Sequence, residues 1–201
     1  VALAQAPKGD AAAGAKLNAS CIGCHGIPGY QSSFPEVHRV PMISGQNAQY
    51  IAGALNAYKK GDRKHPSMRA VAASLSEQNI ADLAAYYATH GASPAVADAA
   101  AVQPTPEVAA LLAKGACVSC HGANFSKPID GAYPKIAGQF PDYLFTALKS
   151  YKAEGNPNVG RNNAIMVGQA KQFSNKELKA LAAYLGSLPA EMRTVAQSKF
   201  R

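Results

Sequence analysis

The chain has 201 residues, of which 48% are hydrophobic and 16% are charged, and this balance excludes an intrinsically disordered protein. The formal net charge of +8 comes from basic residues spread over both halves, which argues against a nucleic-acid-binding surface. No apolar run reaches the roughly 20 residues that a membrane-spanning helix needs.

The N-terminal residues 1–7 read VALAQAP and contain two small-x-small patterns, at residues 2–4 and 4–6. Signal peptides are cleaved at patterns of this kind. We therefore expect an exported protein whose signal peptide has been largely or wholly removed, with these residues as what could remain of it.

Three helices are expected in the first half from the 3.6-residue spacing of apolar side chains. The first runs from about Ala11 to Ser20 and leads into the pentapeptide CIGCH at residues 21–25. The third begins at Ser76, a typical N-cap residue. The second presents one apolar face, formed by Tyr50, Ile51, Ala54, Leu55 and Tyr58.

Small residues and prolines follow, with no long apolar side chains except two valines, and predict a surface linker at residues 93–105. The predicted domains are therefore residues 1–92 and 106–201.

The second half repeats the first. A helix from about Pro106 to Ala116 leads into CVSCH at 117–121, PKIAGQ at 134–139 repeats PMISGQ at 41–46, and Ser174 with Glu177 forms a capping box. Because the repeat covers nearly the full length and no alternating strand pattern occurs, the fold class expected is all-α, with two small domains in tandem.

The cysteines all lie in the two pentapeptides, as Cys21, Cys24, Cys117 and Cys120. Cys-x-x-Cys alone also suits a redox dithiol, half a zinc site or a disulfide. The following histidine favours haem, because two thiols can bond to the haem vinyl groups while the imidazole reaches the iron. We therefore predict two haem c groups, with His25 and His121 as proximal iron ligands.

The sixth iron position decides between electron carrier and catalyst. Met68 and Met166 lie 98 residues apart, in equivalent loops before the third helix of each half, and are the predicted ligands. Two alternatives stay open: both methionines could fill gaps in the core, or His65 could bind the first iron, although its equivalent is Asn163.

Several other residues carry weaker expectations. His38 and His90 have no histidine equivalents and are expected on the surface or in loops. Each proximal imidazole should donate its Nδ1–H to a backbone carbonyl, for which Pro28, Pro35 and Pro128 are candidates. The segment at residues 26–40 is three residues longer than its counterpart and leaves the shape of the first haem's edge open.

The two CxxCH motifs, PMISGQ and PKIAGQ, Met68 and Met166, and the segments SEQNIADLAAYY and SNKELKALAAYL resemble the dihaem cytochrome c4 family. The resemblance covers essentially the whole chain. It implies two cytochrome c folds whose haems face each other across a pseudo-twofold interface. It also implies a periplasmic protein that carries electrons from a quinol-oxidising complex to a terminal oxidase or reductase.

With histidine and methionine on each iron, we expect a soluble two-haem electron shuttle in which no residue performs bond chemistry, and therefore not an enzyme. Two other classes carry similar motifs: a dihaem enzyme of the peroxidase or thiosulfate dehydrogenase type, and the haem subunit of a larger complex such as a flavocytochrome sulfide dehydrogenase. The first needs an iron with a releasable ligand, and the second a flavoprotein partner.

Overall fold

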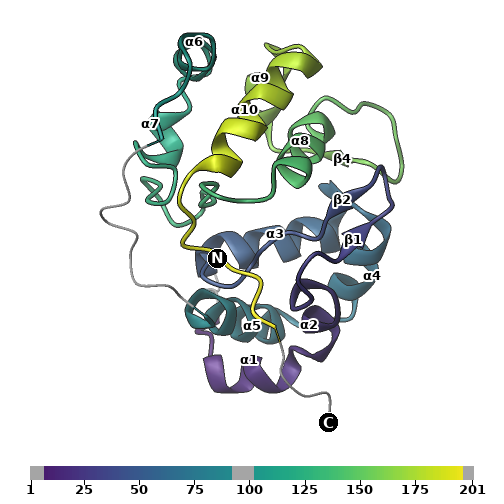
Figure 1. Cartoon of the computed structure of the whole chain (residues 1–201). Coiled ribbons are helices and arrows are strands. Elements are labelled where there is room, and N and C mark those ends of the chain that lie inside the picture. Colours follow the sequence, from purple (N-terminus) through teal and green to yellow (C-terminus); the bar gives the residue numbers. More distant parts are fainter. Residues whose placement is uncertain (1–6, 92–101, 197–201) are drawn as a thin grey trace, which may run out of the picture.

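The fold is given by a computed structural model that describes residues 7–91 and 102–196 (Figure 1). Residues 1–6 of the predicted signal-peptide remnant, and residues 93–101 of the predicted linker, lie outside the described residues. The described chain forms two groups of helices stacked on one another, with α1–α5 in one group and α6–α10 in the other.

The secondary structure is almost entirely helical, which confirms the all-α expectation. The first half contains α1 (Ala11–Leu17), α2 (Ala19–His25), α3 (Ala48–Lys60), α4 (Pro66–Ala73) and α5 (Glu77–Thr89). The second half contains α6 (Pro106–Lys114), α7 (Val118–His121), α8 (Pro141–Ser150), α9 (Ala164–Lys171) and α10 (Asn175–Ser187).

The described residues also form four strands of two residues each, which were not predicted from the sequence. β1 (Gln31–Ser32) pairs antiparallel with β2 (His38–Arg39), and β3 (Arg63–Lys64) pairs antiparallel with β4 (Gly160–Arg161). The second pair joins the two halves, with Arg63 opposite Arg161.

The long helices begin where the sequence predicts them to begin. The Ser76 hydroxyl accepts a hydrogen bond from the Asn79 amide at 3.0 Å, and the Ser174 hydroxyl accepts one from the Glu177 amide at 3.2 Å. In return, Glu177 accepts from the Ser174 amide, which completes the predicted capping box. These caps satisfy amide groups that the first helical turn leaves without partners.

The helices α4 and α9 were not predicted, and they correct one expectation. Met68 lies in α4 and Met166 in α9, in helices of eight residues rather than in loops. Each of these helices spans only about two turns.

Each half has its own hydrophobic core, built from the repeated helices. In the first half, α5 packs against α1 and α3 and buries Ile80 and Leu83 almost completely. In the second half, α10 packs against α8 and α6 and buries the equivalent Leu178 and Leu181. The same helices therefore organise both halves.

The two halves meet through a reciprocal pair of glutamines. Gln46 donates to the Lys135 carbonyl at 2.9 Å and accepts from the Lys135 amide, while Gln139 donates to the Met42 carbonyl at 2.9 Å and accepts from the Met42 amide. Because these residues occupy equivalent positions in PMISGQ and PKIAGQ, the contact has pseudo-twofold symmetry, as expected.

The C-terminal segment, residues 188–196, passes so close to the glycine before each glutamine that a side chain there would collide with it. Gly45 and Gly138 have φ values of +84° and +67°. Residues with a Cβ atom rarely adopt this left-handed backbone conformation. A Cβ on Gly45 would come within 2.9 Å of the Glu191 carbonyl oxygen, and one on Gly138 within 2.7 Å of the Leu188 carbonyl oxygen. The C-terminal segment therefore passes close to both turns.

Met192 in this segment occupies the centre of the interface. Its side chain is 1% exposed, and its sulfur accepts a hydrogen bond from Gln46 Nε2 at 3.1 Å. Gln139 Nε2 lies 3.9 Å from the same sulfur atom. A residue outside the sequence repeat thus packs between the two symmetry-related glutamines.

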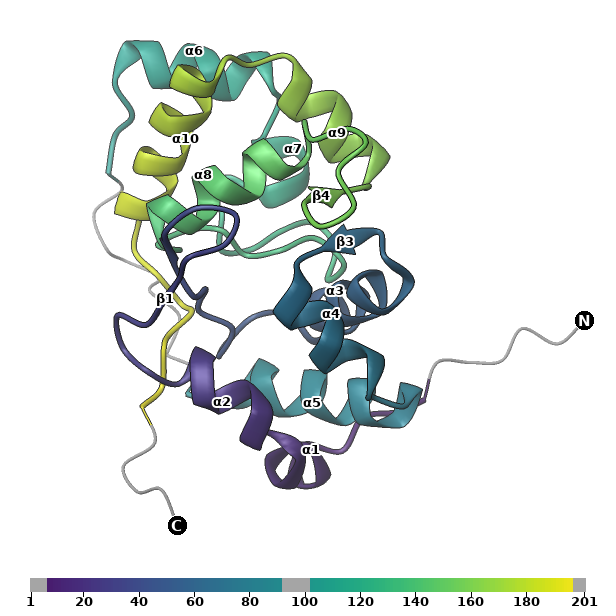
Figure 2. The same ribbon diagram turned by 90° about the vertical axis from the view of Figure 1, so that its right-hand side faces the viewer.

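The longer loop at residues 26–40 is an interface element. It carries the β1–β2 hairpin and lies against α8 of the other half, as Figure 2 shows. Arg39 forms an ion pair with Asp142 at 3.0 Å, and Lys149 forms one with Glu36 at 2.6 Å. Thr146 also donates to Glu36 at 2.7 Å. The extra length of this loop serves contact between the halves.

Candidate functional site

A single cavity of about 600 Å³ extends across both halves of the molecule and is lined by both cysteine motifs. Protein interiors normally leave few voids larger than a water molecule, so a cavity of this size provides room for a large ligand. The four cysteines at its wall are half-buried and form no disulfide. Burial raises the pKa of the Cys21 and Cys117 thiols. Because none of the four forms a disulfide, all of them are free to bond to another group.

The two histidines of the motifs are oriented in the same way. His25 Nδ1 lies 2.8 Å from the Pro41 carbonyl oxygen, and His121 Nδ1 lies 3.0 Å from the Pro134 carbonyl oxygen. Because a carbonyl only accepts, each Nδ1 must be the donor, which leaves Nε2 with a free lone pair for a metal. Proline carbonyls were expected, but Pro28, Pro35 and Pro128 were the wrong prolines.

The surroundings of both imidazoles favour the neutral form. Burial lowers the pKa of His25, against the opposing effect of its bond to Pro41, and the nearby His65 lowers the pKa further. Burial also lowers the pKa of His121. A neutral imidazole with a fixed tautomer is the form that coordinates iron.

The predicted methionines, Met68 and Met166, line the same cavity, and both are half-buried. Their helices begin differently. The Asn163 side chain caps α9 by accepting a hydrogen bond from the Met166 amide at 3.1 Å. The equivalent His65 makes no side-chain capping bond to α4.

His65 also lines the cavity, and its Nδ1 is buried without a partner in the described part of the chain. Its ring makes edge-to-face contacts with Phe34 and with His38. His38 is 5% exposed, which corrects its expected surface position. His90 caps α5, and its Nδ1 lies 3.0 Å from the Ser44 hydroxyl.

The charges that line the cavity are all basic. The described lining includes Arg63, Lys64, Lys135 and Arg161 but no aspartate or glutamate. Lys135 is paired with Glu191 outside the lining, whereas the Nε atom of Arg63 is buried with no partner among the described residues. A cavity with this charge is suited to a ligand that carries carboxylates.

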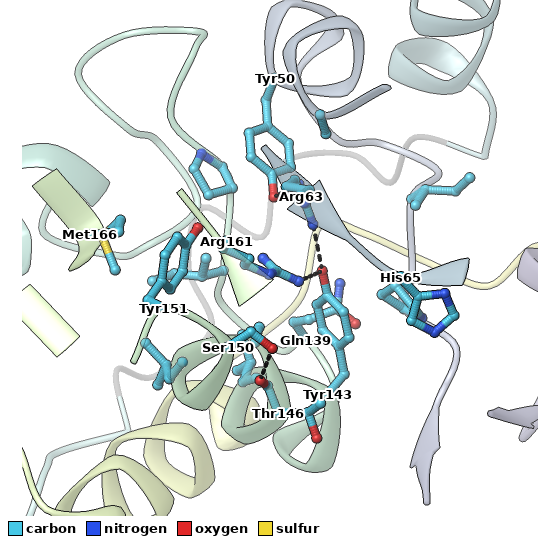
Figure 3. Close-up of a pocket in the computed structure, with 18 of the residues that line it drawn as sticks. Tyr50, Arg63, His65, Gln139, Tyr143, Thr146, Ser150, Tyr151, Arg161 and Met166 are labelled. Atoms are coloured by element: carbon cyan, nitrogen blue, oxygen red, sulfur yellow. Dashed lines mark hydrogen bonds between the residues drawn. The ribbon is translucent and has the colours of Figure 1, made fainter. Parts of the chain in front are cut away.

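The two arginines form a cluster with two tyrosines where the halves meet (Figure 3). The Tyr143 hydroxyl lies 3.4 Å from Arg63 Nη2 and 3.1 Å from Arg161 Nη2, and the Tyr50 hydroxyl lies 3.1 Å from Arg63 Nη1. Sequence reasoning did not single out the arginines. The two arginines are 98 residues apart, as are Met68 and Met166, and this shared spacing was the signal by which they could have been identified.

These features fit two haem c groups. The thiols can form thioethers, the imidazoles present Nε2, the methionines supply sulfur, and the basic lining suits the propionates that each haem carries. The buried polar atoms without partners among the described residues, Arg63 Nε, His65 Nδ1 and the Tyr87 hydroxyl, belong to residues that line this cavity.

Comparison with known proteins agrees with this description. The cytochrome c family model matches residues 11–90 and again residues 107–189. The cytochrome c4 of Azotobacter vinelandii is 32% identical over 193 residues, which cover 90% of each chain. A thiosulfate dehydrogenase electron acceptor from Thiomonas intermedia is 29% identical over 188 residues, covering 90% of this chain and 84% of the relative.

The solved structure of reduced cytochrome c4 from Pseudomonas stutzeri superposes with a TM-score of 0.66 at 27% identity. The superposition covers 90% of this chain and all of that one. With two matches to the cytochrome c model and a relative of the same length above 30% identity, the chain belongs to the dihaem cytochrome c4 family, as an electron-transfer cytochrome with two haem c groups.

Proposed function

We propose that the first iron is bound by His25 and Met68 and the second by His121 and Met166. Cys21 and Cys24 anchor the first haem through thioethers, and Cys117 and Cys120 anchor the second. The observation that supports this assignment is that all eight side chains line one cavity, with both imidazoles held by proline carbonyls.

Each haem, when bound, supplies a one-electron couple between ferric and ferrous iron. The chain's own residues hold the group and exclude competing ligands. The proline carbonyls hold the imidazole rings, and the methionine sulfur atoms would supply the second protein ligand to each iron. With a histidine and a methionine on each iron, the protein would carry electrons and bind no substrate at iron, so the proposed role is that of a carrier and not of an enzyme.

The physiological role that follows is electron transfer between two redox proteins in the periplasm. The donor is a quinol-oxidising complex and the acceptor is a terminal oxidase or reductase. None of the helices in the described ranges has the length and apolar character to cross a bilayer.

A second candidate follows from the Thiomonas intermedia relative, whose name makes it the electron acceptor of a thiosulfate dehydrogenase. In that role this chain would receive electrons from an enzyme that oxidises a sulfur compound. The chain would still be a carrier, and only the donor would differ. Reduction of the purified protein by a quinol-oxidising complex, compared with reduction by a thiosulfate-oxidising enzyme, separates the two donors.

The domain boundaries belong to the same proposal. Domains at residues 1–92 and 106–201, with a linker at 93–105, are supported by the two family matches at 11–90 and 107–189. Limited proteolysis should cut within residues 93–105 first. Initial cleavage at another position would contradict these boundaries.

A redox titration followed by absorption tests the proposed function. We expect two haems per chain, two one-electron steps, and the weak near-infrared band of methionine-bound ferric haem for both irons. The ferrous protein should not bind carbon monoxide rapidly. Rapid binding, or a single haem, contradicts the proposal. Co-purification with a flavoprotein would instead indicate a subunit of a larger oxidoreductase.

A further inference from the structure

The cluster of arginines and tyrosines joins the two halves inside the cavity. Arg63 and Arg161 face each other as partners on β3 and β4, so each half contributes one cation. Figure 3 shows both guanidinium groups directed at the hydroxyl of Tyr143, which comes from α8. Two cations from different halves therefore share one acceptor.

The pseudo-twofold symmetry is broken at this acceptor. Tyr50 and Tyr143 are equivalent residues, and each contacts the arginine of its own half. Tyr143 also accepts from the arginine of the other half, Arg63, at 3.4 Å. Among the described hydrogen bonds, those of Tyr50 reach only Arg63, whereas those of Tyr143 reach both arginines.

The phenol oxygen offsets repulsion between the two cations. The polypeptide lining of the cavity holds no carboxylate in the described residues, so the protein groups that hold the two guanidinium groups are hydroxyl acceptors and ring faces. Arg63 lies over the rings of Tyr50 and Tyr58, and Arg161 over those of Tyr143 and Tyr151. The ring contacts stay within each half, and only the Tyr143 hydroxyl connects both cations.

Fixed cations beside a haem affect its reduction potential. A ferrous iron carries one positive charge less than a ferric iron, so a nearby cation stabilises the reduced form relative to the oxidised form. The effect is larger in a cavity that excludes water. A residue that holds cations in place therefore raises the potential of any haem that they face.

We propose that Tyr143 is a positioning residue shared by both haems, which holds Arg63 and Arg161 in the cavity and thereby raises both reduction potentials, whereas Tyr50 acts through Arg63 alone. This inference rests on the proposed function, because it requires a haem in each half. It assigns the two tyrosines different roles in spite of their equivalent positions.

The test compares Tyr143→Phe with Tyr50→Phe in the full chain with both haems attached. Each substitution removes one hydroxyl and keeps the ring, so the pair is matched in chemistry. We expect Y143F to lower both midpoint potentials and Y50F to lower only that of the first haem. Haem-methyl NMR signals assign each midpoint to its haem.

Two further measurements separate the possible outcomes. If Tyr143 has a purely structural role, Y143F will have a lower melting temperature but unchanged midpoint potentials. That result would overturn the inference. A shift in only one of the two potentials would also overturn it. If Y143F does not attach both haems, the variant R161Q is tested in its place. R161Q should lower the midpoint potential of the second haem more than that of the first. Equal shifts, or no shift, would overturn the inference. A wild-type protein without two one-electron steps would instead contradict the proposed function itself.

Discussion

At the scale of single residues, the two halves hold their proposed histidine ligands in the same way and their proposed methionine ligands differently. Pro41 and Pro134 hold equivalent imidazoles. The amide of Met166 is capped by Asn163, whereas His65 leaves the start of α4 without a side-chain cap. A missing N-cap bond costs a helix about 1 kcal/mol, so α4, which carries the proposed ligand Met68, has a less stabilised N-terminus than α9.

Replacing Met166 by alanine tests the proposed ligand of the second iron. A thioether ligand favours ferrous iron, so its loss should lower the second midpoint potential and open that iron to carbon monoxide. The near-infrared band should lose the contribution of one haem. An unchanged second potential would show that the ligand assignment is wrong.

His65→Asn provides the control at the first iron, because it installs the residue that the second half already carries. If Met68 is the ligand, the near-infrared band of the first haem is retained in H65N and lost in M68A. Loss of histidine coordination signals in H65N would instead identify His65 as the ligand.

The predictability of the site from sequence differs from residue to residue. CxxCH specifies covalent chemistry within five residues, so its members could be identified without a structure. The carbonyls of Pro41 and Pro134 could not be identified from sequence as the hydrogen-bond acceptors, because their positions depend on how the folded chain returns to the cavity. The spacing of 93 residues between Pro41 and Pro134 was the available signal. His38 was misplaced because its burial depends on contacts with the other half.

At the scale of elements, length decides what could be predicted. The helices α3, α5 and α10 have 13 residues each and show their apolar faces over several turns. The helices α4 and α9 have eight residues, and each strand has two, so each offers far fewer repeats of a period than the long helices do. The strands form only because the two halves, or the two sides of a loop, bring them together.

The loop at residues 26–40 makes the contact between halves sensitive to acid. Burial would raise the pKa of Glu36 and Asp142, but hydrogen bonds and the charges of Lys149 and Arg39 lower it for both carboxyls. A folded-state pKa below the unfolded value of about 4 means that the carboxylates stabilise the fold above that pH. This stabilisation is lost as the pH falls through the folded-state pKa.

We therefore expect the free energy of unfolding to fall as the pH drops below the unfolded value of about 4, and to fall less in the double variant E36Q/D142N. Partly exposed ion pairs of this kind contribute up to about 1 kcal/mol each. Urea denaturation at several pH values measures the difference. Glu154→Gln is the control, because that carboxylate is paired with Lys171 within one half and is exposed. Parallel pH curves for the double variant and the wild type would contradict this role.

At the scale of the whole molecule, the repeat predicts two domains but not how they are held together. The reciprocal bonds of Gln46 and Gln139 use residues that the repeat already contains. Met192 lies outside the repeat, and no pattern in the sequence indicates that its sulfur packs between them. The ion pairs of the longer loop join the first half to α8 of the second, and none of the ion pairs in the described residues is their symmetric counterpart. The contact is therefore symmetric at its centre and asymmetric at its edge.

Removal of one haem tests how far each half depends on its cofactor. A domain of about ninety residues buries only roughly 60 to 65% of its unfolded surface, so the haem supplies core that the chain lacks. In the double variant C117A/C120A the second haem is not attached, and we expect amides of α6, α8 and α10 to exchange rapidly with solvent while those of α5 stay protected. C21A/C24A should produce the converse pattern.

Because the glutamine pair and Met192 need both halves folded, the melting temperature of the remaining half should also fall in each variant. Unchanged protection in both halves would show that the polypeptide alone maintains the fold, and that the cavity does not depend on the haem that it holds.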